Sequence, residues 1–300
     1  MRVLTVGDSV RALAVSAGGV LAVGTGGGQI VVHDWASGAQ LLHTLDAPTE
    51  QFAFDPAGTW LAHVQPGGVF FDAVGAELAG TEPHDLSGAF AGGIAISPDG
   101  KTLVAAHAGT SRNVRLSRWS VPGFRAQTGF EFWSPFRRLA FSPNGQFLAG
   151  TNEGEFELRF AVSGGLDYRA SSRTVPLIRR GALQPPLPGT AFVSFTRDSS
   201  TCAFGWSGEI RVLDISTGTS LEVKRLEVPF RAAGFSGSGH TFVTADWDGL
   251  VRVWDARDWA VRRTLDWRCG PLTALAFTPD GTAAAVGTDD GRVVLFDLDD

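Results

Sequence analysis

Apolar residues occur along this chain in short runs that alternate with polar positions and end at turns rich in glycine or proline. Segments 94–106 (IAISPDGKTLVAA), 139–150 (LAFSPNGQFLAG) and 275–287 (LAFTPDGTAAAVG) share one pattern, and 52–62 (FAFDPAGTWLA) follows it closely. In each segment Pro presets φ at the second turn position, Asp or Asn bonds its own backbone, and Gly accepts the positive φ that closes the turn. Each segment therefore predicts a β-hairpin of two apolar strands.

Weaker copies of this hairpin extend the pattern along the whole chain, at 13–24, 193–205 and 233–245. The second turn residues of the seven copies are separated by 39, 42, 45, 54, 40 and 42 residues. A period near 40 residues accommodates about four short strands, which is typical of a propeller blade. The sequence predicts an all-β fold, a seven-bladed β-propeller of four-stranded antiparallel blades that forms a single domain over residues 1–300.

Five of the seven repeats have an aspartate at the same place in the third strand, and the third and fourth repeats lack it. Segment 239–259 (GHTFVTADWDGLVRVWDARDW) resembles a unit of the WD-repeat family, with Trp254 and Asp255 in the place of the family dipeptide. The acidic position recurs in four other repeats, as Asp34, Asp72, Asp214 and Asp297. The resemblance implies a hydrogen-bonded tetrad of His, Ser or Thr, Asp and Trp, of which the sixth repeat contains only Thr244, Asp248 and Trp254.

The opening segment, RVLTVGDSVRA at 2–12, has the apolar run and serine of a GDSL-type hydrolase. Such an enzyme needs a histidine three residues after a late aspartate to activate the serine. No Asp-x-x-His occurs in the chain, so we interpret Ser9 as a turn residue. The last repeat lacks a fourth strand, and the resemblance implies that residues 1–6 supply it and close the ring.

The longest interval contains a basic, Pro-rich segment, 169–189, which is interpreted as an insertion between the fourth and fifth repeats. Apolar runs are too short to cross a bilayer, and no signal peptide is recognisable, so we expect a cytoplasmic protein. The net charge of −6 makes nucleic acid an unfavourable partner. Among the basic residues only two are lysine, which suggests a GC-rich bacterial genome.

Candidate chemistry is sparse. The two cysteines, Cys202 and Cys269, offer neither a disulfide framework nor a CxxC metal spacing. The six histidines have no repeated ligand spacing, so no metal is expected. The glycine run 24–28 is interpreted as a hairpin turn, since it lacks the GxGxxG spacing of a nucleotide loop. We expect no cofactor.

The most informative positions surround the predicted central channel, where the first strand of each blade begins. Arg11, Glu50, Arg137 and Arg231 occupy this column, so three arginines are expected to face one mouth. Loops on the same face add large side chains of the types that often anchor interfaces, namely Trp133, Phe136, Trp206, Phe230, Trp247, Trp267 and Arg268. These residues predict a binding surface for a protein or peptide.

The function expected from these patterns is a non-enzymatic interaction scaffold, a monomer that binds a protein or peptide partner with an acidic segment. One alternative is a propeller enzyme of the hydrolase or lactonase type, which would need several inward-facing His, Asp or Glu at the channel mouth. A second alternative is a sensor module encoded beside a kinase or protease. No membrane or nucleic-acid partner is expected.

Overall fold

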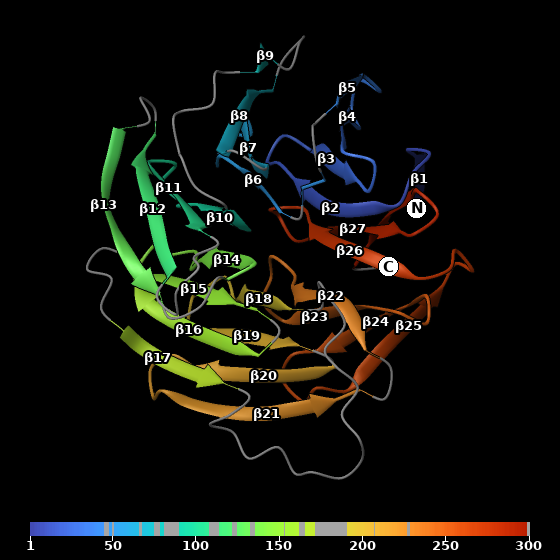
Figure 1. Ribbon diagram of the computed structural model, residues 1–300. Coiled ribbons are helices and arrows are strands. Elements are labelled where there is room, and N and C mark those ends of the chain that lie inside the picture. Colours follow the sequence, from blue (N-terminus) through green and yellow to red (C-terminus); the bar gives the residue numbers. More distant parts are fainter. Residues whose placement is uncertain are drawn as a thin grey trace.

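The computed structural model describes most of the chain, in fourteen stretches of which residues 229–298 form the longest. The described residues are 1–44, 48–49, 51–65, 68–74, 79–80, 90–107, 114–121, 125–132, 136–152, 154–161, 166–171, 191–206, 208–226 and 229–298. They form seven four-stranded antiparallel sheets arranged radially in a ring, which confirms the predicted propeller (Figure 1). No helix in this part of the chain is long and apolar enough to cross a membrane.

Each blade runs from a first strand at the ring axis to a fourth strand at the rim, in sequence order. Blade 1 contains β2 (Val10–Val15), β3 (Val20–Thr25), β4 (Gln29–Asp34) and β5 (Gln40–Thr44). Blade 2 contains β6 (Phe52–Phe54), β7 (Trp60–Gln65), β8 (Gly68–Ala73) and β9 (Ala79–Gly80). Blade 3 contains β10 (Phe90–Ile96), β11 (Thr102–His107), β12 (Val114–Ser120) and β13 (Arg125–Phe132).

The remaining blades repeat this order. Blade 4 contains β14 (Arg138–Phe141), β15 (Phe147–Thr151), β16 (Glu155–Phe160) and β17 (Leu166–Ser171). Blade 5 contains β18 (Phe192–Phe195), β19 (Thr201–Trp206), β20 (Glu209–Asp214) and β21 (Thr219–Arg225). Blade 6 contains β22 (Phe230–Phe235), β23 (Thr241–Asp246), β24 (Leu250–Asp255) and β25 (Val261–Asp266). Blade 7 contains β26 (Leu272–Phe277), β27 (Ala283–Thr288), β28 (Arg292–Asp297) and β1 (Arg2–Thr5).

Blade 7 is completed by the N-terminal strand, as the sequence predicts. β1 pairs antiparallel with β28, with Arg2 opposite Leu295 and Thr5 opposite Arg292. The backbone N–H of Val6 extends this ladder by donating to the carbonyl of Gly291 at 2.8 Å. The chain therefore leaves blade 7 at residue 6 and enters the first strand of blade 1 at residue 10, which closes the ring.

The Gly-Asp-Ser segment between these two strands is a structural turn. Asp8 Oδ2 accepts a hydrogen bond from Gly27 N at 2.5 Å, and Ser9 O accepts one from Gly26 N at 2.8 Å. Side chains at Gly26 or Gly27 would meet Ser9 and Asp8 closely, which explains the glycine run in the hairpin between β3 and β4. Ser9 is thus part of the contact that seats the closing strand on blade 1.

The buried apolar side chains lie between blades rather than in one central core. They form seven clusters, and each cluster joins two neighbouring blades, including blades 7 and 1. Between blades 4 and 5, for example, Phe156 and Phe204 stack with ring centroids 3.8 Å apart. The fold is therefore held by a ring of equivalent interfaces, as expected of a repeat architecture in which no unit buries its own face.

The turns between first and second strands also touch each other around the ring. Each turn ends in a residue with positive φ, which is Gly in six blades and Ser199 in blade 5. In blades 2 to 7 this residue lies against the preceding blade's turn. A Cβ atom at Gly100 would lie 3.2 Å from Pro56 Cδ, and Ser199 Oγ accepts a hydrogen bond from Asn144 N at 3.0 Å. Gly19 in blade 1 breaks the series, because a Cβ there would meet nothing within 4 Å.

The predicted insertion 169–189 is shorter at its N-terminal end than expected. Residues 169–171 belong to β17, because they pair with β16 in the fourth-strand position of blade 4. The remainder of the segment lies outside the described residues.

Aspartates in the turns predict a pH dependence of stability. The Ser97 hydroxyl donates to Asp99 at 2.5 Å and lowers the pKa of that carboxyl below its ordinary 3.8, as Thr196 does for Asp198. A carboxyl whose pKa is lowered by folding stabilises the folded state. This contribution is fully present at pH values above the ordinary pKa of 3.8 and is lost as the pH falls through the lowered pKa of the folded state. We expect the free energy of unfolding, measured in urea, to decline below about pH 4, and Ser97→Ala to raise the pKa of Asp99 in an NMR titration. An unchanged pKa in that variant would contradict the assignment.

Candidate functional site

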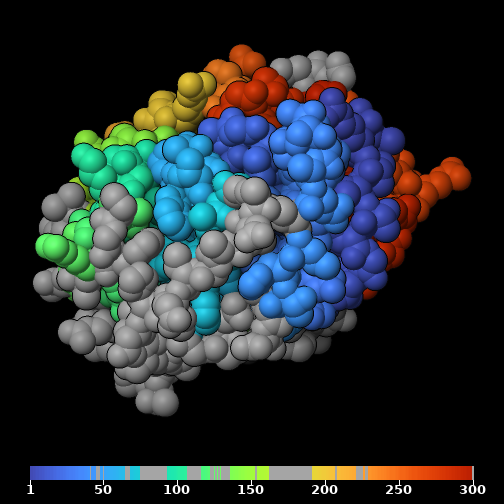
Figure 2. Space-filling view, turned by 90° about the horizontal axis from the view of Figure 1, so that it is seen from above, coloured from blue at the N-terminus to red at the C-terminus, as the bar shows by residue number. Residues whose placement is uncertain are grey.

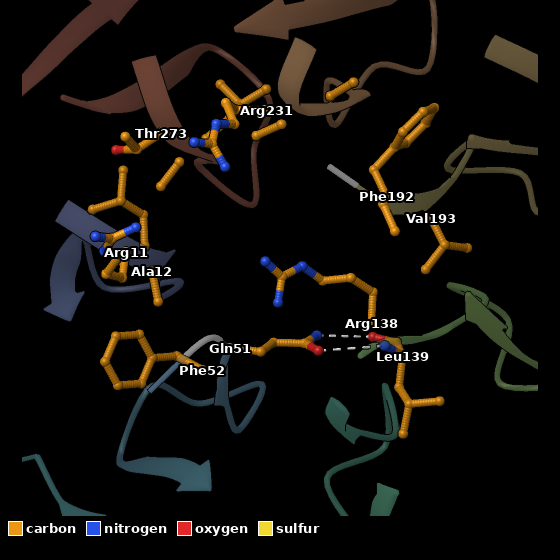
Figure 3. Close-up of a pocket in the computed structure, with 16 residues that line it drawn as sticks. Arg11, Ala12, Gln51, Phe52, Arg138, Leu139, Phe192, Val193, Arg231 and Thr273 are labelled. Carbon is orange, nitrogen blue, oxygen red and sulfur yellow. Dashed lines mark hydrogen bonds between the residues drawn. The ribbon is translucent and has the colours of Figure 1, made fainter. Parts of the chain in front are cut away.

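The channel mouth contains a cavity of about 180 Å³ at the axis of the ring, built from the first strands of six blades (Figure 3). First strands begin at this mouth, so the residues at their starts form its rim. The polar lining residues are Arg11, Gln51, Arg138, Arg231 and Thr273, and the apolar ones are Ala12, Leu13, Phe52, Leu139, Ala191, Phe192, Val193, Ala232, Ala233, Ala274 and Leu275. We call the side of the ring that carries this mouth the arginine face.

Three arginines from blades 1, 4 and 6 surround the cavity. Arg11 lies on β2, Arg138 on β14 and Arg231 on β22, and in Figure 3 the side chain of Arg138 extends into the middle of the space between the other two. Arg231 is partly buried, and this desolvation, together with the nearby charge of Arg11, lowers its pKa, while Asp289 opposes the shift. The mouth therefore concentrates positive charge in a protein of net negative charge.

Local strand irregularities place two of these arginines. Between β2 and β3 the register shifts by one residue at Arg11, and the same shift occurs at Arg231 in blade 6 and at Thr273 in blade 7. A bulge of this kind turns the extra residue away from the regular ladder, and bulges often lie next to functional sites. Here they direct these side chains to the channel mouth.

The third arginine is not the one expected. Arg138 lines the cavity, whereas Arg137 is absent from its described lining. Strand β14 has no bulge of this kind, because Arg138 pairs with Thr151 and Leu139 pairs with Gly150 in unbroken register. Without the extra residue that β2, β22 and β26 contain, the cavity-facing position of blade 4 falls one residue later in the chain, at Arg138. The expectation for Arg137 is therefore corrected to Arg138.

Gln51 occupies the corresponding place in blade 2, next to the predicted Glu50, which lies outside the described residues. The Gln51 side chain donates from Nε2 to Leu139 O at 2.9 Å. Its Oε1 accepts from Leu139 N and Ile94 N, both at 3.3 Å. Gln51 thus connects blades 2, 3 and 4 at the rim, a positioning role that the sequence pattern does not reveal (Figure 3).

Trp247 is the predicted aromatic residue that is most accessible on the arginine face. It follows β23, its side chain is 39% exposed, and its backbone N–H donates to Pro229 O at 3.0 Å. The guanidinium carbon of Arg231 lies 4.1 Å from the centre of its ring, a cation–π contact. An exposed indole and a guanidinium are therefore held together beside the cavity.

Most of the other predicted contact residues serve the fold. Phe136, Trp206 and Phe230 are buried in the clusters between blades, so their side chains are not part of the surface. Trp267 is partly buried, with its ring 5.0 Å from that of Phe296. Arg268 is exposed with a positive φ of 52°, and Trp133 lies outside the described residues.

The signature residues of the sixth blade form a polar network on β23 and β24. Trp254 Nε1 donates to Thr244 Oγ1 at 3.2 Å, the part of the tetrad expected from the sequence. Arg252 forms ion pairs with the buried Asp246 and, at 2.9 Å, with Asp248. Here the carboxylates pair with an arginine, because the blade lacks the family histidine.

The described residues offer no group of three or more His, Cys, Asp or Glu that could hold a metal ion. Within the same part of the chain, the lining of the cavity includes no His, Asp or Glu. Both cysteines are buried and unpaired with each other, and burial raises the pKa of the Cys202 thiol. The charged groups that line the mouth are therefore guanidinium groups, which are cationic hydrogen-bond donors.

Comparisons with known proteins agree with this architecture. The family model described as WD domain, G-beta repeat, matches residues 225–255 and 260–297. The small ribosomal subunit protein RACK1y of Oryza sativa is 38% identical over 58 residues, or 19% of this chain and 17% of that protein. Periodic tryptophan protein 2 homolog of Mus musculus is 34% identical over 93 residues, 30% of this chain and 10% of that protein. The matched region thus spans less than a fifth of each relative.

A solved structure shares the fold over nearly its full length. A chain of Kuenenia stuttgartiensis hydrazine synthase superimposes with a TM-score of 0.78 and covers 99% of this chain and 98% of its own. The two sequences are 13% identical, so this likeness concerns the fold alone.

Proposed function

Because the chain is a WD-repeat β-propeller, we propose that it acts as a non-enzymatic scaffold that docks an acidic segment of a partner protein on the arginine face. WD-repeat propellers generally bind proteins, which supports the scaffold part of this proposal. The observation that carries the choice of face is the convergence of Arg11, Arg138 and Arg231 at one mouth.

Complementary charge is the first argument for an acidic partner. Guanidinium groups bind carboxylates through parallel hydrogen bonds, and their planar fork sets the orientation of the partner. Positive charge at a mouth also speeds encounter with acidic segments, an effect that falls with ionic strength. The partner's association rate is therefore expected to decrease as salt is added.

Trp247 is the second argument. Exposed Trp and Arg side chains are the residue types that most often dominate binding energy at interfaces. The contact between Trp247 and Arg231 restricts both side chains before binding, so less conformational entropy is lost when a partner covers them. We expect the partner to contact Trp247 while its acidic groups reach the arginines.

The proposal is tested by affinity purification from the native host followed by titration with the captured partner. Trp247→Ala is expected to weaken binding at least tenfold, as is typical for an interface anchor. The double variant Arg11→Ala/Arg138→Ala is expected to weaken binding further and to reduce its salt dependence.

Phe160→Ala is the matched control for the tryptophan variant. Phe160 is also an exposed aromatic residue, 44% accessible, but it ends β16 on the opposite face of the ring. It should leave partner binding unchanged. If every captured partner bound the Trp247 and double arginine variants as tightly as the wild type, docking on this face would be wrong.

A further inference from the structure

The cavity between the three arginines has the size of a small-molecule site. It holds about 180 Å³, whereas one water molecule needs about 10–15 Å³ of such space and pockets for drug-sized ligands measure roughly 300–1,000 Å³. A peptide segment laid across the arginine face would cover this cavity without filling it. A compact occupant of several heavy atoms fits the space better.

We propose that this cavity binds a small multivalent oxyanion, of which inorganic phosphate is the simplest representative, through Arg11, Arg138 and Arg231. The site shares its three arginines with the surface proposed for partner docking, but its occupation by a free anion does not depend on any partner.

Hydrogen-bonding capacity supports this site. A guanidinium group has five N–H donors in one plane and can serve several acceptor oxygens at once. Arg138 Nη1 donates weakly to Arg137 O at 3.4 Å. The guanidinium carbon of Arg231 lies 4.1 Å from the centre of the Trp247 ring. Phosphate presents acceptor oxygens in several directions and can therefore bind arginines from different blades at once.

The charge of the site points to a multivalent ligand. Burial of Arg231 lowers the pKa of its guanidinium, and the nearby charge of Arg11 lowers it further. An anion with two or three negative charges, bound between the arginines, attracts all three of them and offsets their mutual repulsion. The single charge of chloride is too small to offset three positive charges. Small side chains at Ala12, Ala232 and Ala274 leave room beside the arginines, and Thr273 adds a hydroxyl group to the lining.

Isothermal titration of the full chain with sodium phosphate tests the proposal, with sodium chloride at equal ionic strength as the reference. Wild-type protein is expected to bind phosphate saturably at one site and to show no saturable binding of chloride. Arg138→Ala should weaken phosphate binding about ten- to a hundredfold, the usual effect of removing a hydrogen bond to a charged group.

Arg257→Ala is the matched control, since this arginine is 78% exposed on the turn after β24, away from the cavity. It should bind phosphate like the wild type. If Arg138→Ala does not fold by circular dichroism, Arg11→Gln takes its place. The oxyanion site would be wrong if the cavity variant and the control variant bound phosphate equally well, or if the wild type showed no saturable binding. Either result would stand regardless of whether a partner protein is captured.

Phosphate also stabilises proteins in general because it is excluded from their surfaces. A phosphate-dependent rise in melting temperature must therefore be compared between the wild type, the cavity variant and the control variant. The phosphate-dependent rise in melting temperature should be larger in the wild type and in Arg257→Ala than in Arg138→Ala. A rise of equal size in all three proteins would mean a general salt effect and would contradict the proposal.

Discussion

Deletion of residues 1–6 should destabilise the whole ring severely. The deletion removes the β1–β28 ladder and the packing of Leu4 and Val6 against the cluster between blades 7 and 1. Backbone hydrogen bonds contribute about 1 kcal/mol each and buried aliphatic side chains about 1.5–3 kcal/mol, so a loss of about 5 kcal/mol or more is expected. Domains have only about 5–15 kcal/mol of stability in total. Urea denaturation followed by circular dichroism measures the change.

Ser9→Ala is the control for this deletion. The Ser9 contacts that seat the closing strand use its backbone carbonyl and N–H, which alanine keeps. The variant should unfold within about 0.5 kcal/mol of the wild type, as surface substitutions usually do. If the truncated chain unfolded at the same urea concentration as the wild type, β1 would not be the element that closes the ring.

Gly281→Ala is expected to be the most damaging single substitution among the interlocking turns. Gly281 has a φ of 75°, and an added Cβ would overlap the backbone of Gly237 in the preceding blade. The left-handed conformation costs an alanine about 1–2 kcal/mol, and overpacking costs typically about 1–3 kcal/mol more. We therefore expect a loss of about 3–4 kcal/mol, measured by urea denaturation.

Gly19→Ala isolates the contact between turns from the backbone strain. Gly19 occupies the same turn position in blade 1 with a φ of 80°, but nothing lies within 4 Å of its Cβ site. This variant should lose only the conformational term of about 1–2 kcal/mol. Equal losses in the two variants would show that the contact between blades 6 and 7 contributes nothing to stability.

Blade number, strand order and ring closure could be predicted from the sequence because they depend on local chemistry. The Pro, Asp and Gly positions of the turns, as in 98–100 and 279–281, determine the hairpins without reference to distant residues. The spacing of about 40 residues between these hairpins then gives the position of every blade along the chain. The contact between each turn and the preceding one was not predictable in the same way, because it arises only when the blades are assembled.

The channel mouth was predicted less completely, since it depends on register. Arg137 and Arg138 are adjacent and identical in type, and only the absence of a bulge in β14 decides which one lines the cavity. Gln51 makes its contact with Leu139 across 88 residues of sequence, for which no local pattern exists.

For the aromatic residues a usable signal was present. Neighbouring residues of a strand face opposite sides, so Phe230 and Arg231 could not both point into the channel mouth. This reasoning does not extend to Phe136, which lies two residues before Arg138, but both phenylalanines are buried between blades. Trp247 escapes this constraint because it lies in a turn, where the backbone does not alternate.

Ring closure by β1 has a mechanical consequence. Arg2 pairs with Leu295 and Thr5 with Arg292, so the outer ends of β1 and β28 lie at the same end of their shared ladder. A force applied through these two ends opens the hydrogen bonds one after another instead of loading all of them at once. At the junction of blades 7 and 1, Gly19 also does not lie against the preceding turn as its counterparts in the other blades do. Under tension the propeller should therefore unzip at its closing strand at a low force, although heat and urea must disrupt the ring as a whole.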